Sequence, residues 1–465
     1  MAKPINPKKV SMAEQPPELR IHNFEEVARG YTPEQAIEEA KRCLVCPKSP
    51  CVSGCPVNVD IPAFIKHVAE GDFRSAADII KRSDALPAIT GRVCPQETQC
   101  EGVCVLKKRF ESVAIGRLER FVADWEATTN TLSSPTILPA TDKKVAVVGS
   151  GPAGLTAAAD LARLGHHVTI FEALHEAGGV LSYGIPEFRL PKGVVKREVD
   201  YVLSLGARLH KDFIVGTSAT VDELLEEYDA VFLGTGAGLP WFLGLPGEDL
   251  GGVYSANEYL TRSNLMKAYR FPEYDTPIAI GQRVIVIGGG NTAMDAARTA
   301  LRLGANEVMI VYRRSRVELP ARLEEVEHAE KEGIQFHLLT TPLAFYGSDG
   351  KVEELECLRN ELGEPDASGR RKPIAIEGSN FRLQADVMVI AVGQSPSPLI
   401  SKTTPELAQG KGGIIKVDPS TMKTSKKGVF AAGDIITGGA TVILAMGQAR
   451  AAARAIHDYL ETGVW

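Results

Sequence analysis

Two glycine-rich turns, each set between a short apolar run and a helical pattern, constrain the fold of this chain more than any other feature. The sequence GSGPAG at residues 149–154 follows KVAVV, and GGGNTA at residues 288–293 follows RVIVI. Glycines at such a turn let the backbone approach a pyrophosphate, and the free N–H groups of the helix N-terminus attract its charge. Because the turns lie about 140 residues apart, we predict two dinucleotide-binding units.

The residue that ends the next strand indicates the ligand of the first unit. The run HHVTIF is followed by Glu172, a carboxylate that would accept a hydrogen bond from a ribose 2′-hydroxyl and repel a 2′-phosphate. The first unit therefore suits FAD or NAD, and a tight turn without a ligand is the alternative. The predicted contacts are Gly149, Gly151, Ala153, Gly154 and Glu172.

The second unit has arginines at the corresponding place, because EVMIVY is followed by Arg313 and Arg314. Guanidinium groups match the doubly charged 2′-phosphate of NADP by paired hydrogen bonds. This favours NADP over NAD; the alternative is a solvated strand end that binds nothing. The predicted contacts are Gly288, Gly290, Asn291, Thr292, Arg313 and Arg314.

A third strand end lies near the C-terminus, where GVFAA is followed by Gly433 and Asp434. We expect this carboxylate beside the flavin nucleotide, although an Asp that only caps a helix is the alternative. A helix expected from Thr441 and Val442 would direct its N-terminus at the pyrimidine edge of the flavin and stabilise negative charge there.

The fold class follows from a change of pattern near Lys144. From there on, short Val/Ile-rich runs end in glycine and are followed by helical patterns, as in buried parallel strands. One such run, DAVFLGTG, ends in Gly236, which we also place at the flavin site. The preceding residues look helical, with a capping pattern at residues 32–35, and the Ser/Thr/Pro-rich residues 127–143 read as a linker.

Seven of the eight cysteines gather between Cys43 and Cys104. The spacing of the first four, from Cys43 to Cys55, resembles a bacterial ferredoxin run with a widened middle gap, in which the fourth cysteine serves the other cluster. Iron–sulfur clusters are therefore expected; zinc, which prefers paired CxxC units, and disulfides are the alternatives. The cysteines concerned are Cys43, Cys46, Cys51, Cys55, Cys94, Cys100 and Cys104.

Two four-iron clusters need eight ligands, one more than this region supplies. Interleaving gives Cys43, Cys46, Cys51 and Cys104 to one cluster and leaves Cys55, Cys94 and Cys100 for the other. A ligand other than cysteine is then needed, unless Cys357 reaches in from a remote domain. Downstream of Cys104, the sequence offers Glu119.

Charge and hydropathy exclude several functions. The net charge of -6 gives no basic face for nucleic acid. No apolar run reaches the roughly 18 residues needed to span a bilayer, and the polar, proline-rich start lacks a secretory signal. We expect a cytoplasmic protein that binds neither nucleic acid nor membrane.

These motifs, together with RCLVCPKSPCVSGCPVNVDIPAFI, GGVLSYGIPEFRLPK and ATVILAMGQ, occur in an order and at spacings that resemble the glutamate synthase small-subunit family. Within it, the chain is most similar to large subunits of NADH-dependent reduced ferredoxin:NADP oxidoreductases, which are electron-bifurcating transhydrogenases. The resemblance implies an N-terminal α-helical domain with two [4Fe–4S] clusters, followed by an α/β flavoprotein with two dinucleotide-binding domains.

The resemblance also implies domain limits and further site residues. The expected limits are 1–140 for the helical iron–sulfur domain, 141–260 and 396–465 for the two parts of the FAD-binding domain, and 261–395 for an inserted NADP(H)-binding domain. Bifurcating relatives have a glutamate cluster ligand where this chain has Glu119. The segment with Gly179 and Leu181 would line the isoalloxazine, with Arg189 beside the ring.

The expected function is hydride exchange between NADPH and FAD, with single electrons passing through the clusters to or from ferredoxin. The resemblance implies a small flavin/[2Fe–2S] partner that binds NAD(H). A glutamate synthase small subunit that feeds a separate large subunit, and a non-catalytic electron-transfer subunit, are the alternatives. No side chain is predicted to act as a catalytic acid or base.

Overall fold

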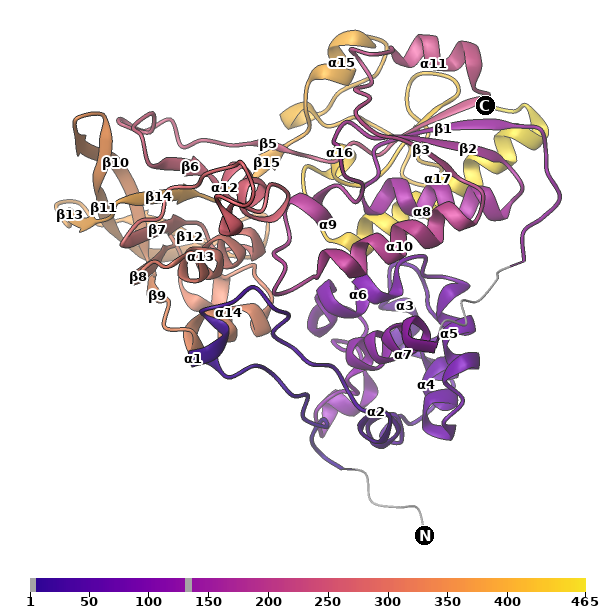
Figure 1. Ribbon diagram of the computed structural model, residues 1–465, viewed down its shortest axis with the longest axis horizontal. Helices are drawn as coiled ribbons and strands as arrows, with labels where there is room; N and C mark the ends of the chain where they lie inside the picture. Colours follow the sequence, from indigo (N-terminus) through magenta and orange to yellow (C-terminus); the bar gives the residue numbers. More distant parts are fainter. Residues whose placement is uncertain (1–5, 130–135) are drawn as a thin grey trace.

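The computed structural model describes residues 6–129 and 136–465, which form a helical domain and two sheet domains (Figure 1). The helical domain lies against the first sheet domain, and the second sheet domain lies to one side of both. Part of the predicted linker, residues 130–135, falls outside the described residues.

The helical domain is built from short helices, as predicted, and its described residues contain no named strand. Thr32 and Gln35 form the expected capping box before the second helix. The helices are α1 (Pro17–Arg20), α2 (Pro33–Ala40), α3 (Pro50–Ser53), α4 (Ile61–Glu70), α5 (Phe73–Lys81), α6 (Pro87–Val93) and α7 (Ile115–Thr129), with 3₁₀ turns at Gln96–Thr98 and Val105–Lys108.

The first sheet domain contains a five-stranded parallel sheet in the order β16-β4-β1-β2-β3. Helices α8 and α17 pack against each other on the side that faces the helical domain (Figure 1). The strands are β1 (Lys144–Val148), β2 (His167–Phe171), β3 (Arg208–His210), β4 (Ala230–Leu233) and β16 (Val429–Ala431). The helices are α8 (Pro152–Arg163), α9 (Val180–Tyr183), α10 (Lys192–Ser204), α11 (Val221–Glu227), α15 (Leu399–Thr403), α16 (Asp434–Thr437) and α17 (Val442–Thr462).

The second sheet domain repeats this plan with a parallel sheet in the order β6-β14-β7-β8-β9. Since β6 pairs with β14, the second sheet already begins at Val253, earlier than the predicted limit at residue 261. The strands are β6 (Val253–Ser255), β7 (Arg283–Ile287), β8 (Glu307–Val311), β9 (Gln335–His337) and β14 (Val387–Ile390). The helices are α12 (Ala256–Asn264), α13 (Asn291–Leu303) and α14 (Leu323–Lys331), with 3₁₀ turns at Ala268–Arg270 and Arg316–Glu318.

The second sheet domain is an insertion in the first, because β16 returns to the first sheet after β14. The two crossings of the chain pair with each other as β5 (Leu239–Pro240) and β15 (Gln394–Ser395). A separate antiparallel sheet, which the sequence did not predict, follows β9 and extends from the second domain (Figure 1). Its strands are β10 (Thr340–Ser348), β11 (Lys351–Pro365), β12 (Arg371–Ala375) and β13 (Phe381–Gln384).

The helical domain and the first sheet domain share one apolar core. A single cluster of buried side chains runs from Tyr31 through Phe121 to Ile456 on α17. Arg450 on α17 adds polar contacts across the boundary, donating to the carbonyl oxygens of Arg82 at 3.3 Å and Ser83. The two domains therefore form one packed body, and their relative position is fixed by burial.

The N-terminal segment extends from the helical domain, places α1 beside α14 of the second sheet domain and then returns to α2 (Figure 1). Arg20 is 1% exposed, and its Nε donates to Glu332 at 2.7 Å. Glu332 also accepts from Arg298 at 2.8 Å and from Arg302 at 2.8 Å. One buried carboxylate therefore holds three guanidinium groups, two of which lie over the ring of Phe188.

None of the helices in residues 6–129 and 136–465 is both long and apolar enough to cross a bilayer.

Glu332→Gln should destabilise the protein by about 3–5 kcal/mol, because it takes the carboxylate partner from buried Arg302 and leaves Arg298 and Arg20 with only one carboxylate each, Glu325 and Glu14. Chemical denaturation measures the loss. Glu330→Gln is the control: its pair with Arg316 is 42% and 44% exposed, so its loss should cost about 1 kcal/mol or less. Equal effects of the two substitutions would contradict the assigned role of Glu332.

Candidate active site

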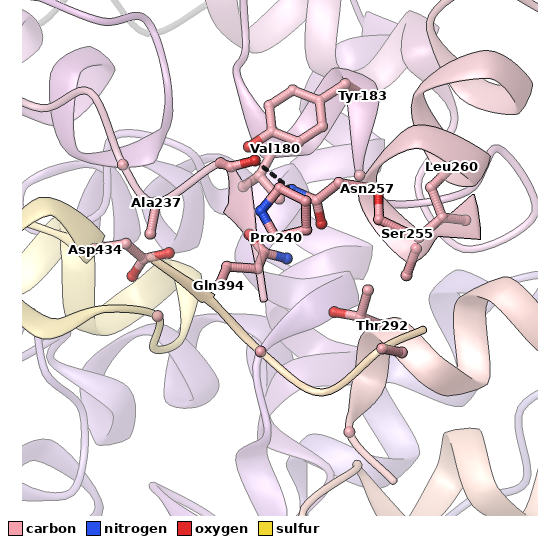
Figure 2. Close-up of a pocket in the computed structure, with 18 of the residues that line it drawn as sticks. Val180, Tyr183, Ala237, Pro240, Ser255, Asn257, Leu260, Thr292, Gln394 and Asp434 are labelled. Carbon is pink, nitrogen blue, oxygen red and sulfur yellow. Dashed lines mark hydrogen bonds between the residues drawn. The ribbon is translucent and has the colours of Figure 1, made fainter. Parts of the chain in front are cut away.

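A cavity of about 1880 Å³ lies between the two sheet domains, and both glycine-rich turns line it. Figure 2 shows Asp434 and Ala237 of the first domain facing Thr292 of the second across this space, with Tyr183 at one side. Asn257, next to Ser255, donates to the carbonyl oxygen of Gly238 at 2.7 Å. The cavity therefore connects the two glycine-rich turns in one continuous space.

The first turn has the geometry that a pyrophosphate requires. Gly149 has φ +97°, and a Cβ on Gly154 would lie 1.8 Å from the carbonyl oxygen of Gly149, so both turn positions need glycine. Gly151 differs, because a Cβ there would meet nothing within 4 Å and Gly151 lines the cavity. The backbone is thus bare where a phosphate would approach the N-terminus of α8, which fits FAD or NAD.

Glu172 is buried at the end of β2 and held in one orientation by the backbone. Its carboxylate accepts from the N–H of Ser150 at 2.9 Å and from the N–H of Leu174 at 2.9 Å. The side chain lines the cavity, so the remaining lone pairs can accept from ribose hydroxyls. This is the position expected for a group that selects an unphosphorylated ribose.

Asp434, Tyr183 and the start of α17 line the cavity from the first sheet domain. Asp434 accepts from the N–H of Ala440 at 2.9 Å, and burial raises the pKa of this carboxyl. Burial, aided by Asp434 and Glu172, raises the pKa of Tyr183 to about 12. Thr441 caps α17, so the helix begins at the predicted residue and directs its N-terminus into the cavity.

The second turn has the same design. A Cβ on Gly288 would lie 2.3 Å from the carbonyl oxygen of Ala391, whereas one on Gly290 would meet nothing within 4 Å. Asn291 begins α13 and accepts from the N–H of Arg322 at 2.9 Å. Thr292, at the next position, faces the first domain (Figure 2). The second turn therefore also leaves bare backbone at the N-terminus of a helix.

The structure separates the two arginines that the sequence treated alike. Both arginines line the cavity, and the side chain of Arg313 is exposed. Arg314 is buried, and its Nη2 is bound to Asp366 at 2.5 Å while its Nε donates to the carbonyl oxygen of Arg371 at 2.7 Å. Arg314 is thus already neutralised by a carboxylate, and Arg313 retains its charge for a ligand.

Three other predicted contacts differ from expectation. Leu181 is fully buried in the apolar core and does not line the cavity, because the side chains of Val180 and Tyr183 face it instead. Gly154 packs under Gly149, so its part is to close the turn. Arg189 lines the cavity, but its guanidinium is held by Asp295 at 2.6 Å and by Glu325 at 3.0 Å.

The remaining predicted contacts line the cavity as expected. In the first domain they are Ala153, Gly179, Gly236, Gly433 and Val442.

Four cysteines gather near the surface of the helical domain. Burial raises the pKa of Cys51 to about 11, and the charges of Cys43 and Cys104 add to the effect. Burial also raises the pKa of Cys43, and the charges of Cys46 and Cys104 add to the effect. These mutual influences bring together the set proposed for one cluster, which we call the outer group: Cys43, Cys46, Cys51 and Cys104.

The other three cysteines surround Glu119 deeper in the domain. Burial raises the pKa of Cys94 and of Cys100 well above the usual value, and Glu119 contributes in both cases. Burial likewise raises the pKa of Cys55 to about 11, again with a contribution from Glu119. We call Cys55, Cys94, Cys100 and Glu119 the inner group.

Helix packing explains how Glu119 reaches this place. Cys94 directly follows α6, and Glu119 lies on α7. A Cβ on Gly91 of α6 would lie 2.5 Å from the backbone nitrogen of Arg120, so only glycine allows this close approach. Among the described residues Glu119 has no basic partner; the Thr90 hydroxyl lies 3.0 Å from it and 2.7 Å from Asp84, a second buried carboxyl that interacts with Glu119. A buried carboxylate without a cation fits an iron ligand.

The geometry disfavours the alternatives to iron–sulfur clusters. None of the eight cysteines forms a disulfide, and all eight lie within the described residues. Within residues 6–129 and 136–465, no three thiols lie within 4.8 Å of one another, as ligands of one zinc ion would. Cys357 is buried in the second sheet domain, in a different apolar cluster, and does not approach either group.

The inner group adjoins the cavity. Val93 and Pro95, on either side of Cys94, line it. On the other flank, a Cβ on Gly447 of α17 would lie 2.6 Å from the carbonyl oxygen of Pro56, which follows Cys55. Val93 and Pro95 are the only described residues of the helical domain that line this cavity, so the inner group is nearer to it and the outer group lies farther away.

Comparison with known proteins agrees with an iron–sulfur domain followed by a flavoprotein. Residues 20–131 match the family model of dihydropyrimidine dehydrogenase domain II with its 4Fe-4S cluster, and residues 143–452 match that of pyridine nucleotide-disulphide oxidoreductases. The glutamate synthase [NADPH] small chain of Halomonas elongata is 38% identical over 96% of this chain and 95% of its own length. The chain belongs to the glutamate synthase small-chain family.

Membership of this family makes the chain a flavin and iron–sulfur oxidoreductase. The beta subunit of an NADP(+)-dependent formate dehydrogenase from Moorella thermoacetica is 41% identical over 89% of this chain, which spans 60% of that subunit. FprA of Mycobacterium tuberculosis, solved in complex with NADPH, has a TM-score of 0.58 at 25% identity, over 69% of this chain and 85% of FprA.

The sequence analysis did not predict several residues that line the cavity. Tyr183 lies inside a quoted motif, but no spacing rule marks it as a contact. Asn257 and Arg370 also line the cavity. Arg370 comes from the antiparallel sheet, whose position relative to the turns no local pattern could reveal.

Glu172→Gln should weaken FAD retention by roughly 1–3 kcal/mol, because an amide cannot accept the backbone and ribose hydrogen bonds together. The FAD-to-protein ratio after dialysis measures the loss. Glu176→Gln, exposed four residues later, is the control. Full retention by Glu172→Gln would remove Glu172 from the ribose site.

Glu119→Ala should perturb one cluster and spare the other. Total iron should fall toward half, or the electron paramagnetic resonance spectrum of one cluster should change, because an oxygen ligand is lost. Glu70→Ala on the exposed side of α4 is the control. Unchanged iron and spectra would refute ligation by Glu119.

Proposed function

We propose that the chain is the NADP(H)-binding subunit of an electron-bifurcating oxidoreductase. FAD would occupy the first turn, NADP(H) the second, and two [4Fe–4S] clusters the inner and outer groups. A small flavin/[2Fe–2S] subunit would handle NAD(H), and ferredoxin would exchange electrons with the outer cluster. The observation that carries the proposal is the spatial order of cavity, inner group and outer group.

Bound FAD and clusters would supply the redox chemistry, in which the electron pair of a hydride is divided into single electrons. The chain itself would position these cofactors and shield the place where they react. Thr292 of the second domain lies across the cavity from Asp434 and Ala237, while Asn257 of the second domain is bound to the carbonyl oxygen of Gly238 in the first (Figure 2). Residues from both domains thus enclose the place where a nicotinamide and a flavin ring would meet.

The N-terminus of α17 supports flavin reduction. Thr441 and Val442 line the cavity, and this helix is 21 residues long. Its positive end favours negative charge on a nearby group. A reduced flavin placed there would be stabilised as the anion without any acid or base from the chain.

The surface around the outer group supports electron exchange with a partner. Leu44, Val45 and Val103 are 45%, 50% and 47% exposed. Basic side chains share the same loops, although the whole chain has a net charge of -6. This combination of an apolar centre and a basic rim suits an acidic one-electron carrier such as a ferredoxin. The exposed basic residues are Lys41, Lys48, Lys107, Lys108 and Arg109.

A second candidate is a glutamate synthase small subunit, which the 38% identity to such a chain over 95% of its length favours. The two candidates share the NADPH, FAD and cluster route and differ in the partner. Purification from the native source distinguishes them: a small flavin/[2Fe–2S] partner supports bifurcation, whereas a large partner that forms glutamate supports the second candidate.

Lys107→Glu with Lys108→Glu should slow electron exchange with ferredoxin about tenfold or more at low ionic strength, since steering depends on charge. Anaerobic NADPH should still bleach the flavin at the wild-type rate. Lys411→Glu, an exposed change on the first sheet domain, is the control. A wild-type protein that NADPH does not bleach would refute the proposed function; unaltered ferredoxin exchange in the double variant would refute the docking surface.

A further inference from the structure

We propose that the β11–β12 hairpin selects the 2′-phosphate of NADP(H), and that Arg370 at its tip binds this phosphate together with Arg313. Asp366 at the same tip is a positioning residue, which holds Arg314 in place. The inference rests on the proposed function, because it assumes a dinucleotide at the second turn. It adds a specificity element that lies far from that turn in the sequence.

The tip of the hairpin is a tight, internally bonded turn. The N–H of Asp366 donates to the carbonyl oxygen of Arg370 at 2.8 Å, and the N–H of Gly369 donates to that of Asp366 at 2.9 Å. The Asp366 carboxylate accepts from the N–H of Ser368 at 2.8 Å. These bonds fix the backbone of Arg370 before any ligand binds.

The tip is also tied to the end of β8. Asp366 is bound to Nη2 of Arg314 at 2.5 Å, and Nε of Arg371 donates to Glu318 at 3.1 Å. Asn360 on β11 donates to the carbonyl oxygen of Arg313 at 2.9 Å. The hairpin and the strand end therefore form one rigid wall, and both Arg313 and Arg370 line the cavity there.

The charges along this wall are unequal. Arg314 is neutralised by Asp366, whereas Nε of Arg370 donates only to the Ser368 hydroxyl, at 3.0 Å. Within the part of the chain that the structure describes, the two Nη groups of Arg370 have no hydrogen-bond or ion-pair partner. Among residues 6–129 and 136–465, neither Arg313 nor Arg370 pairs with a carboxylate, so both can offer charge to a dianionic phosphate.

The same wall disfavours NAD(H). A ribose without phosphate is best held by a carboxylate acceptor at this strand end. The carboxylate on this wall is Asp366, and it already accepts hydrogen bonds from Ser368 and Arg314. The hairpin therefore supplies positive charge for the phosphate and withholds the acceptor that would favour the hydroxyl.

Arg370→Gln in the complete holoenzyme should raise the dissociation constant of NADPH and of 2′,5′-ADP about tenfold, through loss of a charged hydrogen bond. The dissociation constant of NADH should not change. Isothermal titration calorimetry measures all three ligands. Arg370→Lys, which keeps the charge but not the fork, should recover part of the affinity.

The matched control is Arg382→Gln, an exposed arginine of the same antiparallel sheet that pairs with Glu354. It should leave all three dissociation constants unchanged. Asp366→Asn should weaken NADPH less than Arg370→Gln does, without affecting NADH, and restoring the carboxylate as Asp366→Glu should recover part of the loss.

The outcomes separate the inference from the proposed function. If wild-type protein prefers NADPH and Arg313→Gln abolishes the preference while Arg370→Gln does not, the hairpin inference is wrong and the proposed function stands. If wild-type protein binds NADPH and NADH alike, both are overturned. Equal weakening of NADPH and NADH by Arg370→Gln, with an unchanged melting temperature, would also overturn the inference.

Discussion

The close approach of the helical domain to α17 is the constraint on which the rest of this structure depends. Gly447 leaves room for the carbonyl of Pro56, and Arg450, one turn further on, is bound to Asp160 at 3.1 Å and to carbonyl groups of the helical domain. Because electron transfer weakens steeply with distance, a side chain at Gly447 would act on function as well as on packing. The shared apolar core fixes the distance between α17 and the helical domain. The positions of the cavity and of both cysteine groups depend on this distance.

Features that depend on local sequence were predictable. The two glycine-rich turns, the carboxylate at Glu172 and the start of α17 at Thr441 each follow from residues close together in the chain. The division of the cysteines could also be predicted, since it depends on counting ligands. The surroundings of Glu119 agree with that count: it lies among Cys55, Cys94 and Cys100 because α6 and α7 pack at Gly91.

Features that depend on contacts between distant segments were not predictable. The limit of the second sheet domain lies at Val253 because β6 pairs with β14, which follows more than a hundred residues later. Leu181 points into the core because α9 turns Val180 and Tyr183 toward the cavity. The state of Arg314 is set by Asp366, on a hairpin whose strands carry no nucleotide-binding pattern.

Arginine therefore serves two purposes in this chain, and only the partners tell them apart. Arg20, Arg298 and Arg302 all pair with Glu332. Their charges are thereby neutralised in a contact that joins the N-terminal segment to the second sheet domain. Burial alone would raise the pKa of Glu332, but the guanidinium groups of Arg298 and Arg302 hold it well below its usual range. Arg313 has an exposed side chain at the cavity and no carboxylate partner in the part of the chain that the structure describes. A guanidinium whose charge is already matched stabilises the fold, whereas one left unmatched at a cavity wall remains able to bind an anion.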